Sequence, residues 1–383
     1  MRYRSLIIPG LLWAAVAYDM GVVTFTTNDI ISTLNVDKTL AGLLVSITLV
    51  GWFFGSLLFG YISDKFGRKR IVVGATILHV LATALMALSL SYTYFLVLRF
   101  IAGFGFGMVL PVLSAWVSQS ASIEIRGRMV VLLDSFWTYG WITASLSAYL
   151  YMPHLNSGDW NIYYLLSILW LIAVIPALRL PEVQISKNHK FSQILRWKHT
   201  LFLWILWFAM AFSYYGIFVW LPHIVAENVP TVKSYGFIFL TYLAQIPGYF
   251  TAAYLVEKVG RRYVIFSFMI LTGLSAYLFI TNYVGMFTAA AFALSFFDLG
   301  AWGALYAYTP ELYPDELKGS GAGAASSVGR IGGILGPLIP GLVHWFYAFL
   351  SFTLILIIAA FFVLLMPETL NRNIKINEQN DAL

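Results

Sequence analysis

The chain has 383 residues, of which 60% are hydrophobic and only 10% are charged, and its formal net charge is +6. A soluble domain carries about 25% charged residues, so this composition excludes an ordinary water-soluble protein and indicates a chain embedded in a bilayer. The sequence has no cysteine, which excludes disulfides and thiolate metal sites.

Apolar stretches of about 20 residues, the length that a helix needs to cross a bilayer, recur along the chain. We expect twelve spans, at residues 6–33, 39–62, 71–90, 92–119, 128–151, 160–180, 200–226, 234–256, 263–281, 284–309, 319–342 and 345–366. Backbone polar groups in lipid need internal partners, so these spans are expected to be helices. The sequence therefore predicts an all-α membrane protein.

A polar stretch at residues 181–199 separates the first six spans from the last six. It is predicted to be a cytoplasmic linker between an amino-terminal six-helix bundle at residues 1–180 and a carboxyl-terminal bundle at 200–370. The polar residues 371–383 are expected to form a cytoplasmic tail.

Lysine and arginine are distributed unevenly between the two sides of the predicted spans. Of the 23 basic residues, 19 fall on the side that holds both termini, two fall on the other side and two lie inside spans. This asymmetry follows the positive-inside rule and predicts that both termini are cytoplasmic, in a plasma-membrane protein. The excess of basic residues therefore indicates how the chain is oriented in the membrane and does not predict a nucleic-acid partner.

Three short polar patterns occur once in each half, at matching places. The clearest is the basic hinge at residues 60–70 (GYISDKFGRKR), with a weaker copy at 257–262 (EKVGRR). The other two pairs are residues 124–127 with 316–319, and residues 181–182 with 367–368. Repeats of this kind predict a duplicated bundle, as in many secondary transporters, and hence two pseudo-symmetric bundles.

Five charged residues lie inside predicted spans, where a charge costs several kcal/mol unless it is paired or hydrated. They are Asp19, Arg99, Asp134, Asp298 and Arg330. We expect Asp19 to pair with Arg99, and Asp298 with Arg330, either as static ion pairs or as pairs that separate to load a proton. Asp134 has no evident partner and is expected to line a hydrated cavity or to bind a cation. Arg330 suits a substrate carboxylate.

Polar and aromatic residues inside spans are further candidates for substrate binding. They are Trp137, Tyr214, Tyr215, Gln245, Trp302 and Tyr306. Their polar groups are able to hydrogen-bond a substrate and the rings to stack on one, although aromatic residues also serve as interfacial belts or as packing. The histidines show no metal-ligand spacing, and His79 is expected to be a structural helix residue rather than a proton carrier. No nucleotide-binding or catalytic motif is present, so an enzyme, a cofactor and a metal site are not expected.

The hinge at residues 60–70 resembles the signature between the second and third spans of the major facilitator superfamily. Within that superfamily, residues 245–262 and 299–333 resemble niacin permeases and the related organic-ion and synaptic-vesicle-type transporters, and residues 18–23 resemble sugar porters. Asp298 stands where niacin permeases are expected to have a neutral residue. The resemblance implies a cytoplasmic gate formed by Asp64, Arg68, Glu124, Arg126, Glu257, Arg261 and Glu316.

The sequence thus favours a monomeric secondary transporter of a small organic ion, an aromatic carboxylate such as nicotinate, driven by protons. In this interpretation Arg330 holds the carboxylate, Trp302, Tyr306 and Tyr214 hold the ring, and Asp19 with Arg99 couples proton movement. One alternative is a sugar porter that uses Gln245, Trp302 and Asp134. The others are an organic-cation carrier that uses Asp298 or Asp134, and a sensor that transports nothing.

Overall fold

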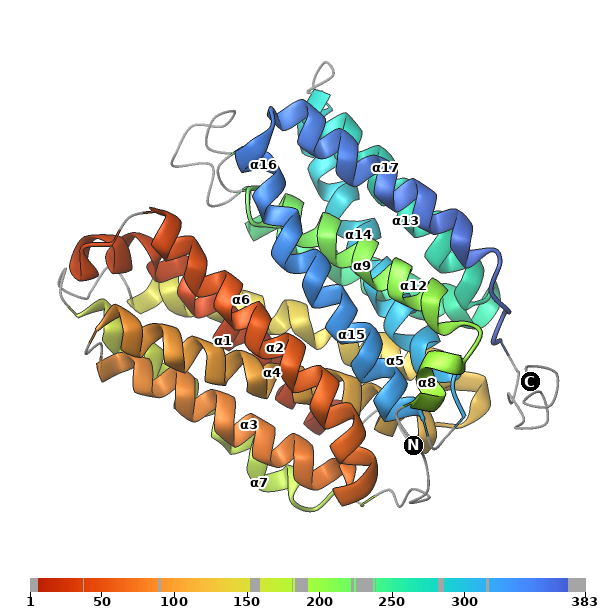
Figure 1. Ribbon diagram of the computed structural model, residues 1–383, viewed down its shortest axis with the longest axis horizontal. Helices are drawn as coiled ribbons and strands as arrows, with labels where there is room; N and C mark the ends of the chain where they lie inside the picture. Colours follow the sequence, from red (N-terminus) through yellow and green to blue (C-terminus); the bar gives the residue numbers. More distant parts are fainter. Residues whose placement is uncertain are drawn as a thin grey trace.

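The computed structural model describes residues 6–36, 38–88, 91–151, 159–180, 182, 192–221, 224, 237, 239–281, 286–314 and 317–370. Regular structure within these ranges is entirely helical (Figure 1). Each of the twelve predicted spans is occupied by helix over most of its described part. Eight of the described helices are long and apolar enough to cross a membrane on their own.

The first six spans form one group of helices. Their bounds are α1 Ile7–Leu34, α2 Lys38–Phe66, α3 Arg68–Leu85, α4 Tyr92–Ser120, α5 Arg126–Asp134, α6 Phe136–Tyr151, the 3₁₀ helix η5 Trp160–Ala173 and α7 Val174–Ala177. The predicted fifth span is divided at Ser135 into α5 and α6. The sixth span differs more, because residues 160–173 adopt 3₁₀ geometry, which rarely extends beyond three or four residues.

The last six spans form the second group. Their bounds are α9 Thr200–Phe218, α12 Gln245–Lys258, α13 Arg261–Thr281, α14 Phe287–Glu311, α15 Lys318–Leu335, α16 Ile339–Leu342 and α17 Trp345–Val363, preceded by the short α8 Ser192–Arg196. The predicted eleventh span is interrupted after α15 by a 3₁₀ turn at Gly336–Leu338, where Pro337 cannot continue the hydrogen-bonding pattern.

Small residues set how closely the helices approach one another. A Cβ added at Gly51 would lie 2.2 Å from the carbonyl oxygen of Phe100, and one at Gly103 would lie 2.0 Å from that of Thr48. Helices α2 and α4 therefore touch backbone to backbone, as glycine-rich faces allow in lipid.

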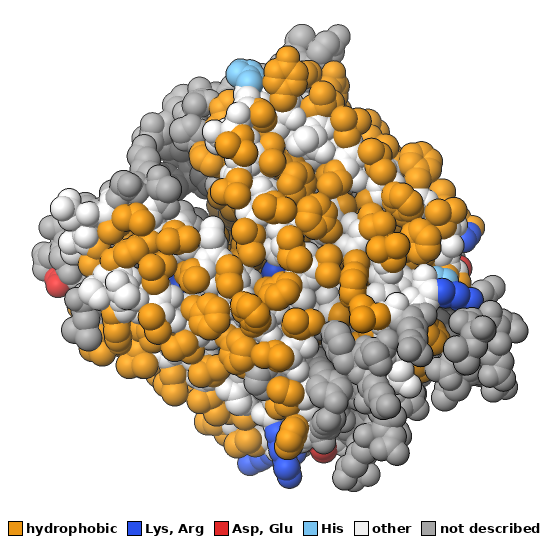
Figure 2. Space-filling view, in the orientation of Figure 1, with side chains coloured by type: hydrophobic (Ala, Val, Ile, Leu, Met, Phe, Trp, Pro, Cys, Tyr) orange, Lys and Arg blue, Asp and Glu red, His pale blue; other side chains and the backbone are white. Residues whose placement is uncertain are grey.

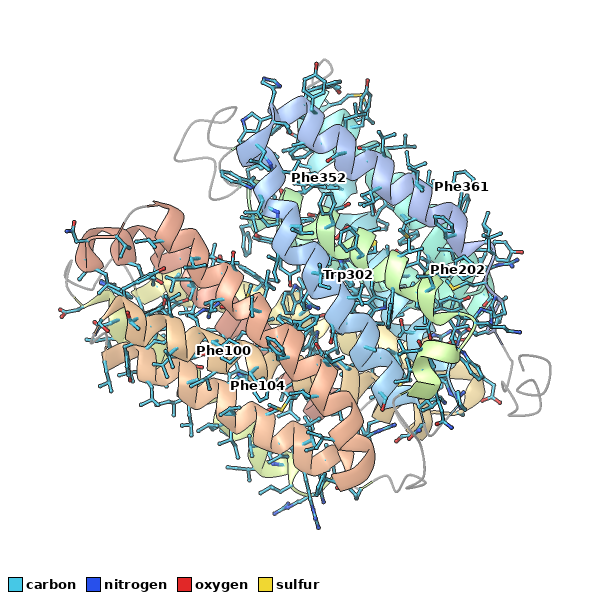
Figure 3. The ribbon with its side chains drawn as sticks, in the orientation of Figure 1. Phe100, Phe104, Phe202, Trp302, Phe352 and Phe361 are labelled. Carbon is cyan, nitrogen blue, oxygen red and sulfur yellow. The ribbon has the colours of Figure 1, made fainter. Side chains whose placement is uncertain are left out.

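The two groups meet along α15, which crosses against α2, and along α14 and α12, which pack against α5. They lie close together near α5 and α8 and diverge toward α16 (Figure 1). Side chains such as Leu169, Ile172 and Leu365 are exposed on the outside, where hydrophobic atoms dominate the visible face (Figure 2). Trp302 lies instead in the interior, close to where the groups meet (Figure 3). Such an apolar exterior suits contact with lipid.

Candidate functional site

A cavity lies between the two groups of helices and is lined by both. Its volume, measured as the space open to the centre of a water molecule, is about 30 Å³. A buried water needs about 10–15 Å³ on this measure, so the cavity has room for water and admits a ring-sized ligand only when its walls move. The lining residues are Trp13, Trp52, Asp134, Trp137, Tyr214, Tyr215, Tyr249, Leu299, Trp302, Tyr306 and Arg330.

Most of the residues predicted to bind substrate come together in this cavity. The structure places Asp134, Trp137, Tyr214, Tyr215, Trp302, Tyr306 and Arg330 in its wall. Asp298 and Gln245 are not in it. Sequence reasoning missed Trp13 and Trp52, from α1 and α2, and Tyr249 from α12, although Tyr249 follows Gln245 by one helical turn.

Arg330 projects from α15 across the interface between the groups. Its guanidinium carbon lies 3.9 Å from the ring centroid of Trp52, a cation–π contact with the first group. Its Nη1 donates a hydrogen bond to the Tyr215 hydroxyl at 2.7 Å, and its Nε has no hydrogen-bond partner among the described residues. The side chain is buried, with only 2% exposed, so the charge is held among aromatic rings and away from bulk water.

Asp134 ends α5 on the first-group side of the cavity. Its Oδ1 accepts a hydrogen bond from the indole Nε1 of Trp13 at 3.2 Å, which corrects the expectation that it has no protein partner. Its Oδ2 has no hydrogen-bond partner within the described part of the chain. The carboxylate interacts electrostatically with Arg330. The cavity thus has an acid from the first group and a base from the second.

Aromatic rings complete the wall. Trp13 stacks on Trp137, with 5.0 Å between ring centroids, and the Nε1 of Trp137 donates a hydrogen bond to the Tyr214 hydroxyl at 3.3 Å across the interface. Trp302 lies edge-on to Tyr214, with centroids 6.1 Å apart. Stacked and edge-on rings of this kind give a rigid apolar wall with a few hydrogen-bonding groups, which suits a flat aromatic ligand.

The predicted pairing of Asp298 with Arg330 is wrong. Asp298 is buried on α14, and neither of its carboxylate oxygens has a hydrogen-bond partner among the described residues. Arg330 is engaged instead by Tyr215 and Trp52. The two residues lie on neighbouring helices, and Asp298 interacts electrostatically with the phenol of Tyr214.

Gln245, at the start of α12, joins the two groups rather than lining the cavity. Its Oε1 accepts a hydrogen bond from the hydroxyl of Thr138 on α6 at 3.0 Å. The amide therefore has a structural partner in the opposite group of helices.

The predicted pair of Asp19 and Arg99 also differs in its contacts. Arg99 Nη1 donates to the backbone oxygen of Asp19 at 3.2 Å, not to its carboxylate. The carboxylate accepts a hydrogen bond from the Ser167 hydroxyl and lies 2.7 Å from the Nδ1 of His79. The structure therefore makes His79 the ionisable partner of Asp19, where we expected only a structural residue.

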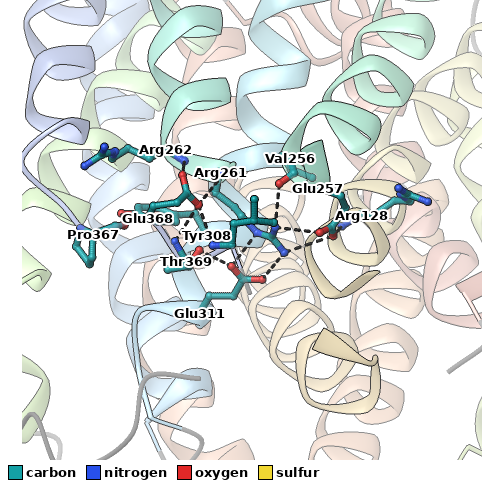
Figure 4. A network of polar contacts seen from close by, with 11 residues as sticks. Arg128, Val256, Glu257, Arg261, Arg262, Tyr308, Glu311, Pro367, Glu368 and Thr369 are labelled. Carbon is teal, nitrogen blue, oxygen red and sulfur yellow. Dashed lines mark hydrogen bonds and ion pairs between the residues drawn. The ribbon is translucent and has the colours of Figure 1, made fainter. Parts of the chain in front are cut away.

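Two of the residues assigned to a cytoplasmic gate, Glu257 and Arg261, are brought together in the second group. Arg261 is bound by Glu257 and Glu311, each at 3.0 Å (Figure 4). Glu257 also accepts a hydrogen bond from the backbone N–H of Arg128, at 2.7 Å, and this contact crosses to the first group. A Cβ added at Gly127 would lie 2.4 Å from Nη2 of Arg261, so this network is pressed against the start of α5.

The remaining gate residues are distributed differently. Arg68 donates a hydrogen bond to Gln119 at 2.7 Å, where its counterpart Arg261 has Glu311. Glu124 is exposed, and hydrogen bonds from its own backbone N–H and from Ser122 hold the pKa of its carboxyl below the usual range. Arg126, next to it, begins α5 and is half-buried. The side chain of Asp64, and Glu316 as a whole, lie outside the described residues.

The repeated Pro-Glu pattern has a clear structural meaning. Glu368 accepts hydrogen bonds from the backbone N–H groups of Arg261 and Arg262, both at 3.0 Å, at the start of α13. Glu182 does the same for Lys69 at the start of α3, at 3.1 Å. A carboxylate at a helix N-terminus is favourable because it meets unpaired N–H groups and the positive end of the helix dipole. The equivalent contacts in both groups agree with the predicted duplication.

Comparison with known proteins places this geometry in a family. The family model described as Major Facilitator Superfamily matches residues 9–241 and 229–381. The chain is 34% identical over 425 aligned positions to the niacin transporter NiaP of Acinetobacter baylyi, an alignment that covers 98% of this chain and 96% of that protein. It is 37% identical over 353 positions to the putative niacin/nicotinamide transporter NiaP of Bacillus subtilis, an alignment that covers 87% of this chain and 86% of that protein.

The fold is shared with a solved structure. The proton:xylose symporter XylE, determined with 6-bromo-6-deoxy-D-glucose bound, superposes with a TM-score of 0.81 at 17% identity and covers 96% of both chains. At that identity the likeness establishes the fold of twelve helices in two bundles and leaves the substrate open. Relatives and fold together identify a membrane transporter, and the resemblance seen in the sequence is confirmed. The chain belongs to the major facilitator superfamily.

Proposed function

We propose that this chain is a secondary active transporter that moves an aromatic monocarboxylate, with nicotinate as the first candidate, across the plasma membrane by alternating access coupled to protons. The observation that carries the proposal is the position of Arg330: a buried guanidinium from the second bundle rests on Trp52 of the first, inside a cavity walled by indole and phenol rings. The names of the two NiaP relatives support the same substrate class.

Arg330 is suited to the carboxylate of such a substrate. Tyr215 accepts a hydrogen bond from Nη1 and Tyr306 also interacts with the guanidinium, while Nε has no hydrogen-bond partner among the described residues, so a side chain that lines the cavity retains a free donor. A planar guanidinium binds a carboxylate through two parallel hydrogen bonds, each stronger for being charge-assisted. The stacked rings of Trp13 and Trp137 offer a flat apolar surface for the ring of the substrate.

Asp134 is suited to a ring nitrogen. Trp13 donates a hydrogen bond to one carboxylate oxygen, while the other accepts none among the described residues, although the Tyr249 hydroxyl interacts with the carboxylate. One proton shared between this oxygen and a pyridine nitrogen satisfies both groups. A benzene ring leaves the buried oxygen unsatisfied, which costs about 1–3 kcal/mol. This polar contact favours nicotinate over benzoate.

Alternating access follows from a cavity shared between two bundles. The domain division that we propose is a first bundle at residues 1–180, a linker at 181–199, a second bundle at 200–370 and a tail at 371–383. In this arrangement both termini are cytoplasmic and the chain acts as a monomer. The contact of Glu257 with the backbone of Arg128 then holds the cytoplasmic side closed.

Uptake of radiolabelled nicotinate into proteoliposomes, with and without a pH gradient, tests the proposal. We expect saturable uptake that is stimulated by an inward proton gradient and is competed by unlabelled nicotinate but not by xylose or carnitine. The variant Arg330→Lys keeps the charge but loses the two-pronged geometry, so we expect the KM to rise at least about tenfold, the equivalent of about 1.4 kcal/mol. Arg330→Gln is expected to abolish uptake.

The matched control is Arg179→Gln, which removes an exposed arginine after α7 and is expected to leave uptake unchanged. Nicotinate uptake that persists in Arg330→Gln removes the assigned role of Arg330. Competition by xylose favours the sugar porter, and competition by carnitine favours the organic-cation carrier.

A further inference from the structure

The first bundle contains a second buried polar cluster, separate from the cavity lining. The Oδ2 of Asp19 on α1 lies 2.7 Å from the Nδ1 of His79 on α3. The Oδ1 of Asp19 accepts a hydrogen bond from Ser167 of η5. The side chains of Asp19 and His79 are both 0% exposed. Ionisable groups inside a span are costly, and those that persist commonly mark ion or proton pathways.

The identity of the partner matters for the chemistry. Arg99 donates hydrogen bonds to the backbone oxygen of Asp19 at 3.2 Å and to the sulfur of Met20 at 3.7 Å, and it acts on the Asp19 carboxylate through its charge alone. The group hydrogen-bonded to the carboxylate is an imidazole, a side chain able to carry a transferable proton, whereas a guanidinium keeps its proton. The Nε2 of His79 has no hydrogen-bond partner among the described residues, so one nitrogen of the ring is available to a proton.

We propose that His79 and Asp19 together form the binding site for the transported proton. In the unloaded site a neutral imidazole donates its Nδ1–H to the Asp19 carboxylate. Loading adds one proton to Nε2 and gives an imidazolium beside a carboxylate, and release breaks the same N–H bond. This inference rests on the proposed function, because it supplies the ion whose gradient drives the substrate.

The charged groups around the pair set how readily it loads. Arg99 of α4 and Tyr18 of α1 face the His79–Asp19 pair. From η5 come Ser167 and the phenols Tyr163 and Tyr164, the last of which interacts with Arg99. The titratable residues of α2 lie only near its ends, and α7 has none. With Arg99 counted, the cluster is neutral when unloaded and carries one positive charge when loaded, so loading requires the proton-rich side of the membrane.

A continuous chain of contacts joins this site to the substrate cavity. The guanidinium of Arg330 lies 3.9 Å from the Trp52 ring, Trp52 meets Phe106 edge-on at 5.6 Å, and Phe106 meets His79 edge-on at 5.2 Å. A substrate carboxylate bound to Arg330 shifts the guanidinium together with the Trp52 ring on which it rests, and this moves Trp52 against Phe106. Packed elements with two discrete arrangements are a physical route for coupling between sites.

The first experiment needs no substrate. Infrared difference spectra of the reconstituted protein, recorded during a pH titration and with isotope-labelled histidine rings, report protonation of the imidazole and any shift of an ionised carboxylate band beside it. We expect the wild type to show the imidazole signal coupled to such a shift, and both His79→Asn and Asp19→Asn to lose this coupled pair of signals. Asparagine places an amide where Nδ1 stood, so the contact to Asp19 is retained in His79→Asn. The matched control is His344→Asn, at an exposed histidine before α17. Identical titrations of wild type and His79→Asn overturn the proposal, whatever the substrate.

The second experiment separates coupling from transport. A tenfold proton gradient supports about tenfold accumulation of substrate at one proton per molecule. We expect His79→Asn to lose this accumulation and the nicotinate-driven proton flux, measured with a pH dye inside the vesicles. Nicotinate exchange at equal pH should stay within about twofold of wild type, as expected when only the proton-dependent step is removed. A purely structural histidine predicts that His79→Asn keeps accumulation and proton flux. Absence of any nicotinate flux in the wild type refutes the proposed substrate, while the infrared spectra still decide the proton site.

Discussion

The guanidinium of Arg330 lies 3.9 Å from the ring centroid of Trp52, so a charge that belongs to the second bundle rests on an aromatic face of the first. The contact joins the bundles at the cavity, and it holds the guanidinium in place before any substrate arrives. Fixing a binding group in its working position reduces the ordering cost of binding. Trp52 is therefore part of the site.

We expect Trp52→Leu to weaken nicotinate binding by about tenfold or more, because a desolvated cation–π contact is worth about 2 kcal/mol. Trp52→Phe keeps an aromatic face and is expected to lose less. Binding is measured on the purified protein by isothermal titration calorimetry. The control is Trp116→Leu, which removes a buried tryptophan of α4 outside the cavity and should lower thermal stability without changing affinity. Equal losses of affinity in Trp52→Leu and Trp116→Leu contradict the assignment.

Asp134→Leu tests the contact with a ring nitrogen. Leucine is close to aspartate in size but has no polar group to bind the pyridine nitrogen, whereas an asparagine amide would still donate a hydrogen bond to it. We expect the preference for nicotinate over benzoate, measured as a ratio of inhibition constants for labelled uptake, to fall by about tenfold, the equivalent of a hydrogen bond of about 1–1.5 kcal/mol. An unchanged ratio removes Asp134 from substrate recognition.

The parts of the molecule that follow from general constraints were predictable from the sequence. Bilayer thickness sets the length of the twelve apolar stretches, and the repeated hinge and Pro-Glu patterns point to two related bundles. Asp134 and Arg330 are found because a charge inside a span stands out. Trp13 and Trp52 carry no such signal, since a tryptophan in a span also fits the membrane interface or lipid.

The pairings were not predictable, for a geometric reason. Asp298 and Arg330 are expected at similar depths, but depth leaves open which way each helix turns its side chain about its own axis. The same uncertainty hid His79, which meets Asp19 only because α3 and η5 pack together against α1. Small residues such as Gly105, where a Cβ would lie 2.8 Å from that of His79, help to fix this packing.

The two helix-capping glutamates allow a comparison within one molecule. Glu368→Gln removes the charge from a partly buried N-terminus where two helix N–H groups are bound, and we expect it to cost about 1–2 kcal/mol of stability. Glu182 is exposed and accepts one described hydrogen bond from a helix N–H group, so we expect Glu182→Gln to cost less stability. Thermal unfolding in detergent, followed by circular dichroism, gives the two Tm shifts. A larger shift for Glu182→Gln contradicts this ranking.

A disulfide between the bundles tests alternating access itself. The hydroxyls of Ser56 on α2 and Ser327 on α15 are 3.2 Å apart, and both side chains are buried at the crossing of the two helices. Because the chain has no cysteine, Ser56→Cys combined with Ser327→Cys introduces the only two thiols. The hydroxyl contact places the two side chains within reach of each other, and a disulfide needs Cβ atoms about 3.5–4.5 Å apart, so oxidation should link the bundles close to the arrangement seen here.

We expect the oxidised double variant not to transport nicotinate, and dithiothreitol to restore transport. Each single variant should transport nicotinate whether oxidised or reduced. Full transport by a double variant shown to be cross-linked would mean that α2 and α15 do not separate during the cycle, and the movement would have to be sought elsewhere in the fold.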